Sequence, residues 1–265
     1  MTSRVDLGTH CLQTYVDGPA GAPWLILSNS LGASAEMWEP QIPALTENFQ
    51  VLRYDTRGHG KSDVPKGPYS FQHLVDDVVR LMDAHGIETA RFMGLSKGGM
   101  TGLGMALSHP DRIERVVCAD GRSDAPPPFK AMWDERIGKV EADGMAGIVE
   151  GTMATWFTPD WLDANPESAD KVRRMILSHE PAGYIANCRA LQGLDYFRHL
   201  SNIGIPVLYV GGSHDKGASP EVMQAMADAT PGGRFIEIPG AAHVANINAP
   251  EAFNKAVLDF LTTDI

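Results

Sequence analysis

The stretch that most constrains the fold of this 265-residue chain is RFMGLSKGGMTG, at residues 91–102, where glycines surround a single serine. An apolar run with the composition of a strand leads into it, and a small-residue run typical of a helix follows. Residues 94–98, GLSKG, fit the pattern G-x-S-x-G, in which a sharp strand-to-helix turn exposes a serine hydroxyl. Glycine suits such a turn because neighbouring backbone segments approach too closely for side chains. The stretch therefore predicts that Ser96 stands at the carboxyl edge of a sheet, with a glycine-rich turn capped by serine as the alternative.

Short β-rich runs alternate with longer helical patterns along the rest of the chain. This alternation predicts an α/β fold with a mostly parallel central sheet and helices on both faces. Most of the β-rich runs are almost continuously apolar, as is typical of strands buried on both faces. We expect strands at residues 24–30, 49–55, 90–96, 115–120, 206–212 and 234–240, and helices at 70–86, 219–230 and 249–261.

The alternation stops between about Asp124 and Phe197. The segment APPPF marks an exit from the sheet, and the residues that follow have helical patterns rich in Met, Trp and Ala. We interpret residues 124–197 as a helical cap, or lid, inserted into a core formed by residues 1–123 and 198–265.

Composition excludes several classes of function. Hydrophobic residues make up 43% of the chain and charged residues 21%, which argues against a disordered protein. The net charge of −11, without a dense basic run, argues against a nucleic-acid partner. No secretory signal and no apolar run of membrane-spanning length is present, so we expect a cytoplasmic protein without a membrane partner. The three cysteines, Cys11, Cys118 and Cys188, lie far apart and fit reduced thiols better than a disulfide or zinc framework. The composition does not decide whether the chain forms an oligomer.

Two residues downstream could activate Ser96. A serine hydroxyl is a weak nucleophile unless a histidine removes its proton and a carboxylate orients that histidine. Asp215 follows the strand at 206–212, and His243 follows the last strand, which is the acid-then-histidine order expected after a G-x-S-x-G turn. Each could instead be a capping or surface residue, and we interpret the neighbouring His214 as a loop residue. The order and placement predict a triad of Ser96, Asp215 and His243.

Hydrolysis through a serine also needs donors for the oxyanion that develops on the substrate carbonyl. We expect the backbone N–H of Lys97 to be one donor. The other is expected from the loop LSNSLGAS, with the Ser30 N–H as first choice and the Leu31 N–H as second, and Gly32 keeps that loop close. A plain turn is the alternative.

The stretches LSNSLGASAEMWEPQIPAL, VLRYDTRGHGKSDVPKGPYSF and MGLSKGGMTG, with much of residues 154–195, resemble the 3-oxoadipate enol-lactonase family of the α/β-hydrolase superfamily. The resemblance covers nearly the whole chain. It implies an α/β-hydrolase fold, hydrolysis of a five-membered enol-lactone, and no metal or organic cofactor. Ser96, Asp215 and His243 match the triad of the family, and Ser30 and Lys97 match its oxyanion-hole positions. The turn DTRGHG, at residues 55–60, matches a family turn that we interpret as scaffold: Asp55, Arg57 and His59.

The chain departs from this family at Lys97, where members usually carry Met or another uncharged residue, and at the segment CADGRSDAPPPF. The Lys97 side chain could face the cavity, where it would hold a substrate carboxylate or tune the histidine. Alternatively it turns away and pairs with Asp120 or Asp124. Arg122 and Arg189 are further candidate carboxylate binders, with solvated surface arginine as the alternative for each.

Aromatic residues of the predicted cap could wall a small acyl pocket, although their helical spacing fits the core of the cap equally well. These residues are Trp133, Met153, Trp156, Phe157 and Trp161. The candidate substrate-binding residues are thus Leu31, Arg122, Trp133, Trp156 and Arg189. The sequence predicts a serine hydrolase of a small carboxylic ester or lactone, foremost an enol-lactone. A carboxylesterase, a carbon–carbon bond hydrolase, a perhydrolase and a non-catalytic ligand receptor on the same fold are the alternatives.

Overall fold

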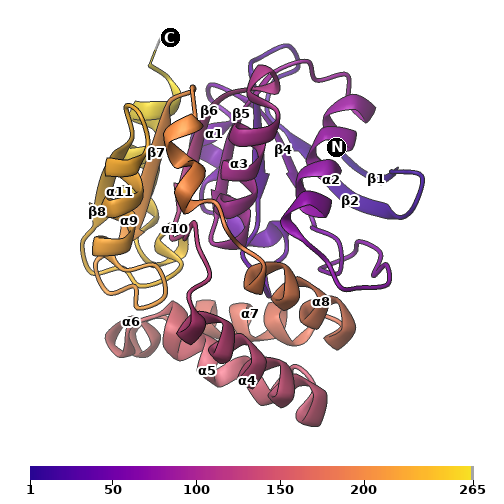
Figure 1. The fold of residues 1–265 in the computed structure, drawn as a ribbon, viewed down its shortest axis with the longest axis vertical. Coiled ribbons are helices and arrows are strands. Elements are labelled where there is room, and N and C mark those ends of the chain that lie inside the picture. The colour runs from indigo at the N-terminus through magenta and orange to yellow at the C-terminus, as the bar shows by residue number, and fades with distance from the viewer. Residues whose placement is uncertain (264–265) are drawn as a thin grey trace.

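An eight-stranded sheet with the order β1-β2-β4-β3-β5-β6-β7-β8 forms the centre of the molecule (Figure 1). The computed structural model describes residues 1–263. The strands from β3 to β8 are parallel, whereas β1 and β2 add an antiparallel hairpin at one edge. The bounds are β1 Thr2–Asp6, β2 Cys11–Asp17, β3 Trp24–Ser28, β4 Gln50–Tyr54, β5 Ala90–Leu95, β6 Ile113–Ala119, β7 Val207–Gly212 and β8 Arg234–Ile238. The predicted parallel strands are confirmed, and the hairpin was not predicted.

Helices cover both faces of this sheet, as predicted. In β3, Leu25 and Leu27 pack into one buried apolar cluster and Ile26 packs into another on the opposite face. The helices of the core are α1 Ile42–Leu45, α2 Phe71–Ala84, α3 Lys97–Ser108, α9 Pro220–Ala229, α10 Ala245–Asn248 and α11 Pro250–Leu261. The 3₁₀ turns are η1 Ala35–Trp38, η2 Pro110–Arg112 and η3 Phe197–Asn202.

A group of helices between β6 and β7 lies across the carboxyl ends of the parallel strands (Figure 1). They are α4 Pro127–Asp143, α5 Ala146–Trp156, α6 Pro159–Ala164, α7 Pro166–Leu177 and α8 Pro181–Gln192, and we call α4 to α8 the cap. Apolar side chains of the cap, such as Ile137 and Ile176, share one buried cluster with Leu27 of the sheet. The division into a core and a separate cap domain at residues 124–197 stays a prediction.

Helix α8 approaches the core more closely than side chains would allow. A Cβ atom placed on Gly183 of α8 would lie 2.2 Å from the carbonyl oxygen of Gly58, and one placed on Gly58 would lie 2.8 Å from the Gly183 Cα. Gly58 also has a φ of +77°, which favours glycine. Backbone therefore packs directly on backbone here, so α8 is fixed to the turn at residues 55–60.

None of the helices described in residues 1–263 is both long and apolar enough to cross a lipid bilayer. Cys11, Cys118 and Cys188 are all free thiols in the structure.

Candidate active site

Ser96 occupies the sharp turn between β5 and α3, with φ 53° and ψ −117°. A positive φ is rare for a residue with a side chain and marks a strained backbone. The flanking glycines explain how the turn forms. A Cβ atom on Gly94 would lie 2.1 Å from the Gly98 carbonyl carbon, and one on Gly98 would lie 2.0 Å from the Ser28 carbonyl oxygen. The turn therefore tolerates no side chain at either position, as the sequence predicts.

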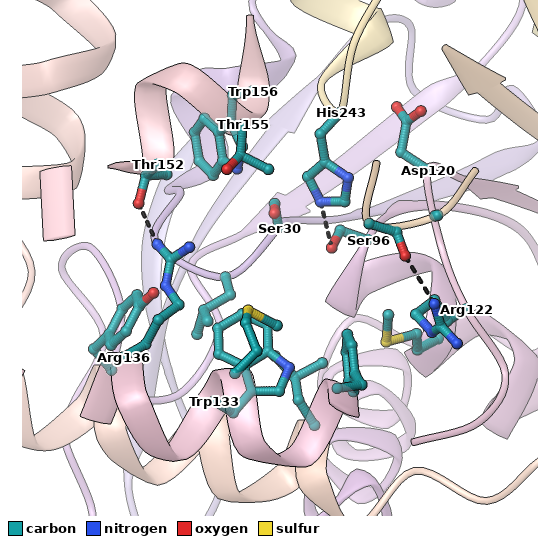
Figure 2. Close-up of a pocket in the computed structure, with 18 residues that line it drawn as sticks. Ser30, Ser96, Asp120, Arg122, Trp133, Arg136, Thr152, Thr155, Trp156 and His243 are labelled. Carbon is teal, nitrogen blue, oxygen red and sulfur yellow. Dashed lines mark hydrogen bonds between the residues drawn. The ribbon is translucent and has the colours of Figure 1, made fainter. Parts of the chain in front are cut away.

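The structure brings together the three residues expected to form the triad. The His243 Nε2 atom lies 3.0 Å from Ser96 Oγ (Figure 2). On the other side of the ring, His243 Nδ1 lies 2.8 Å from Asp215 Oδ2. The other carboxylate oxygen, Asp215 Oδ1, accepts backbone N–H bonds from Gly217 at 2.7 Å and Ala218 at 3.0 Å. Asp215 is thus held by its own loop, and it fixes the orientation of the imidazole that faces the serine.

The charges of this group support an acid–base role for His243. Burial acts to raise the pKa of Asp215, but the charge of His243 and hydrogen bonds from His243 and the loop amides lower it below its usual value. Burial acts to lower the pKa of His243, but the charge and hydrogen bond of Asp215 raise it above its usual value. Asp215 is therefore ionised at neutral pH, and it stabilises the imidazolium that forms when His243 accepts a proton.

A second buried carboxylate, Asp120, lies at the end of β6 beside this pair. Its two oxygens accept backbone N–H bonds from Gly212 at 2.9 Å and from Ala245 at 3.0 Å. Burial, and then the charge of Asp215, raise the pKa of Asp120 well above its usual value. Asp120 joins the strand that precedes Asp215 to the segment that follows His243, so it helps to hold both residues in place.

One of the two oxyanion donors differs from the first choice made from the sequence. The Ser30 N–H is already engaged, because it donates to Met37 Sδ at 3.4 Å. In contrast, neither the Leu31 N–H nor the Lys97 N–H has an acceptor within residues 1–263. The side chain of Ser30 still lines the cavity. The second choice, Leu31, therefore replaces Ser30 as the candidate donor, and Lys97 remains the other.

The Lys97 side chain neither faces the cavity nor forms the expected ion pair. It is fully buried, and its Nζ donates to Thr56 Oγ1 at 2.7 Å and to Asn187 Oδ1 at 3.0 Å. It does not line the cavity, and it forms no ion pair with Asp120 or Asp124. The ion pair with Asp124 is made by Arg122 instead.

A cavity of about 110 Å³ opens beside Ser96 and His243 and lies between the sheet edge and the cap (Figure 2). Trp133 and Trp156 both line it, as do Leu31 and Arg122. Further apolar lining comes from Met100, Phe129, Met132, Tyr184 and Leu191. This volume fits a small acid or lactone better than a long acyl chain.

Other aromatic and basic candidates lie outside this cavity. Arg189 is 44% exposed and pairs with Asp134 at 2.7 Å, so the expectation that it binds substrate is wrong for this geometry. Phe157 stacks on Trp161 with ring centroids 4.0 Å apart. These two residues and Met153 belong to the cap interior or its edge, as the alternative interpretation predicted.

Arg136 of α4 is a cavity residue that the sequence did not single out. Its guanidinium donates to Thr152 Oγ1 and lies over the Trp133 ring at 5.4 Å from the centroid. Its Nε is buried without a hydrogen-bond partner, and within residues 1–263 no carboxylate pairs with it. Arg122, on the opposite side of the cavity in Figure 2, is engaged by Asp124 and by the Gly217 carbonyl. Arg136 is thus the cavity cation with capacity left for an anion.

The turn at residues 55–60 supports the site as scaffold. Asp55 accepts N–H bonds from Ala35 at 2.8 Å and Lys61 at 2.9 Å, and Arg57 pairs with Asp77. His59 Nε2 accepts the Gly32 N–H at 2.8 Å, next to Leu31, whose N–H is the candidate oxyanion donor. His214 is exposed in its loop. No group of three or more His, Cys, Asp or Glu side chains that could hold a metal ion occurs in the described part of the chain.

Comparisons with known proteins agree with this geometry. The profile of the alpha/beta hydrolase fold family matches residues 23–250. 3-Oxoadipate enol-lactonase 1 of Acinetobacter baylyi is 36% identical over 250 residues, covering 94% of this chain and 92% of that protein. A protein of Caulobacter sp. (strain K31) with the provisional name carbamate hydrolase RutD is 34% identical and covers 92% of this chain and 93% of its own length. The crystal structure of the enol-lactonase from Burkholderia xenovorans LB400 has a TM-score of 0.95 and 39% identity, with 98% of this chain and 100% of that chain covered.

Proposed function

Since the chain belongs to the α/β-hydrolase fold family, we propose that it hydrolyses a small carboxylic ester or lactone through Ser96, His243 and Asp215. The preferred substrate is a lactone with a free carboxylate, foremost 3-oxoadipate enol-lactone. The observation that carries this proposal is the continuous hydrogen-bonded series from Asp215 through His243 to the Ser96 hydroxyl, at the mouth of a small cavity. The similarity to enol-lactonases supports the choice of substrate.

The reaction begins when His243 Nε2 takes the proton of the Ser96 hydroxyl and Ser96 Oγ attacks the lactone carbonyl carbon. The carbonyl oxygen becomes an oxyanion, which the Leu31 and Lys97 N–H groups stabilise. The positive end of the α3 dipole adds to this stabilisation. The ring C–O bond then breaks, and the imidazolium of His243 returns its proton to the leaving enol oxygen.

Ring opening leaves an acyl-enzyme in which the former ring remains attached to Ser96 as one chain. Water then attacks the ester carbonyl, with His243 as general base, and the same N–H groups hold the second oxyanion. Ser96 Oγ leaves with the proton from His243, and the free acid is released. Every step uses groups of this chain and water.

Arg136 provides a reason for preferring a substrate with a carboxylate. The net charge of −11 repels an anion at long range, so an anionic substrate needs a local cation in the cavity. Arg136 lines the cavity, no carboxylate of residues 1–263 pairs with it, and Trp133 supports the guanidinium face. A carboxylate there would accept charge-assisted hydrogen bonds from a group that is partly desolvated.

The test is a side-by-side assay of wild type and Ser96→Ala on an enol-lactone, a p-nitrophenyl ester, a carbamate and a carbon–carbon ring-cleavage product. We expect wild type to be fastest on the enol-lactone and Ser96→Ala to lose nearly all turnover on every substrate while keeping the wild-type circular dichroism spectrum. Prompt labelling of wild type, but not of Ser96→Ala, by an organophosphonate excludes the ligand receptor. Appreciable hydrolysis by a clean Ser96→Ala preparation would contradict the mechanism.

A further inference from the structure

A buried polar cluster lies behind the oxyanion donors, on the side away from the cavity. It consists of Thr56, His59, Lys97, His179 and Asn187, and we call it the Lys97 cluster. Thr56 and His59 belong to the turn at residues 55–60, Lys97 begins α3, His179 follows α7, and Asn187 lies on α8. All five side chains are buried. The cluster therefore joins the serine turn, the oxyanion loop and the cap.

Both oxyanion donors are connected to this cluster. Lys97 supplies one N–H from its own backbone, while its Nζ binds Thr56 and Asn187. The Thr56 carbonyl accepts the His59 N–H at 2.9 Å, and His59 Nε2 accepts the N–H of Gly32 at 2.8 Å. Gly32 directly follows Leu31, the other donor. A displaced Lys97 side chain would thus alter the spacing of the two N–H groups.

The geometry fits a neutral amine better than an ammonium. A neutral amine has two N–H donors, and Nζ has two acceptors at 2.7 and 3.0 Å. An ammonium would present a third N–H and a full charge, yet within residues 1–263 no carboxylate lies at ion-pair distance from Nζ. A buried charge without such a partner is strongly disfavoured. Consistently, burial lowers the pKa of Lys97 to about 7.

The titratable neighbours of Lys97 come from every element packed around it. His59 and His179 stay neutral, because burial lowers the pKa of His59 well below its usual value and that of His179 to about 4. Burial raises the pKa of the Cys188 thiol of α8 to about 12, so it stays protonated. Asp77 of α2 is already bound by Arg57 through two hydrogen bonds of 2.6 Å.

We propose that Lys97 is a positioning residue whose side chain, as a neutral amine bound to Thr56 and Asn187, sets the spacing of the two oxyanion N–H groups. This inference rests on the proposed function, which assigns those N–H groups to the oxyanion. It also predicts that protonation of Lys97 at lower pH disrupts the spacing and slows the reaction.

Lys97→Met tests the proposal on any ester that wild type hydrolyses, such as p-nitrophenyl acetate. We expect kcat to fall about 10- to 100-fold with KM changed less than about twofold, because the N–H groups act mainly on the transition state. Lys97→Gln keeps a neutral group with two N–H donors and should recover part of kcat. Lys97→Arg introduces a permanent charge and should not. A kcat of Lys97→Met within twofold of wild type would overturn the proposal.

The pH profile supplies a readout that a merely structural role would not move. Wild type needs both His243 and Lys97 to be neutral, so the acid limb of log kcat/KM should approach a slope of about 2. In Lys97→Met only His243 remains, and the slope should fall to about 1. Equal slopes in the two proteins would also overturn the proposal.

Two further variants separate positioning from general destabilisation. Tyr209→Phe removes a buried hydrogen bond of 2.7 Å to Thr230, away from the cavity, and should keep the wild-type kcat. If Lys97→Met does not fold, Thr56→Val removes one acceptor of Nζ and should lower kcat in the same way, whereas an unchanged kcat would overturn the proposal. The outcomes for the two proposals can be told apart. Appreciable ester hydrolysis by Ser96→Ala would refute the proposed function itself. An inactive Ser96→Ala with a fully active Lys97→Met would refute only this inference.

Discussion

The carboxyl edge of the sheet and the cap both face the substrate cavity, but they are built in different ways. At the sheet edge, Ser96 and His243 are placed by backbone contacts that leave no room for side chains, as at Gly94 and Gly98. In the cap, cavity residues such as Trp133 and Arg136 are placed by contacts between side chains. Under the proposed function, this difference assigns the chemistry to the sheet edge and the choice of acyl group to the cap.

The largest expected effect on stability and activity together comes from a glycine-to-alanine substitution at the sheet edge, and the same substitution in the cap serves as its comparison. Gly98→Ala would place its Cβ 2.0 Å from the Ser28 carbonyl oxygen, so the turn must move. We expect a loss of about 3 kcal/mol or more in the free energy of unfolding, together with loss of activity. A Cβ atom on Gly138, in α4 of the cap, would meet no atom of residues 1–263 within 4 Å outside its own turn of helix. Gly138→Ala should therefore stabilise the protein by about 0.5–1 kcal/mol. Urea unfolding measures both, and equal effects would contradict the comparison.

Asp215→Asn tests the chemistry of the sheet edge without a change in size. Asparagine can accept the two loop N–H bonds, but it cannot stabilise the His243 imidazolium or fix its tautomer. By analogy with other triads we expect kcat to fall about 10⁴-fold, with KM nearly unchanged. Steady-state kinetics on one ester provides the measurement. A loss of less than tenfold would mean that another group, such as Asp120, orients His243.

Arg136→Gln tests the role of the cap in selecting an anionic substrate. We expect kcat/KM for a lactone with a free carboxylate to fall about 10- to 100-fold, because a charge-assisted contact is lost. A neutral ester of the same size should be unaffected. Arg189→Gln is the matched control, since Arg189 is a cap arginine that pairs with Asp134 outside the cavity. Equal losses on charged and neutral substrates would remove Arg136 from the binding of the carboxylate.

The smallest expected effect is a shift in the pH at which activity reaches half of its plateau. His243 must be neutral to accept the Ser96 proton, and Asp215 raises its pKa above 6.5. Activity should therefore rise with pH, and at pH 6.5 it should be less than half of its plateau. The pH dependence of kcat/KM for a neutral ester tests this expectation. A midpoint below pH 6.5 would show that burial outweighs the charge of Asp215.

Sequence patterns predicted the sheet edge closely because its determinants are local. Short runs rich in apolar and β-branched residues identified the strands from β3 to β8, and the glycines around Ser96 identified the turn. Strands β1 and β2 were missed because neither carries a continuous apolar run: β1, at the edge of the sheet, alternates between exposed and half-buried residues, and β2, Cys11–Asp17, mixes apolar residues with Gln and Thr. The prediction therefore depended on how apolar each run is, and a strand that mixes polar and apolar residues does not stand out in this way.

The remaining differences between the predicted and the observed site arise from contacts between segments that are distant in the sequence. The choice between the Ser30 and Leu31 N–H groups depends on how Met37 engages the loop. The direction of the Lys97 side chain depends on Asn187, 90 residues away. Arg136 lies in a charged helical segment, WDERIGK, where nothing in the sequence distinguishes it from surface arginine. Local patterns could not resolve these positions.

The backbone contact between Gly58 and Gly183 gives the cap an anchored side and an adjustable side. Variant libraries that diversify α4 and α5 should yield new substrate ranges at little cost to folding. Libraries that include α8 would also disrupt the contact between Gly58 and Gly183. Most of their members would then fail to fold, whatever their substrate selectivity.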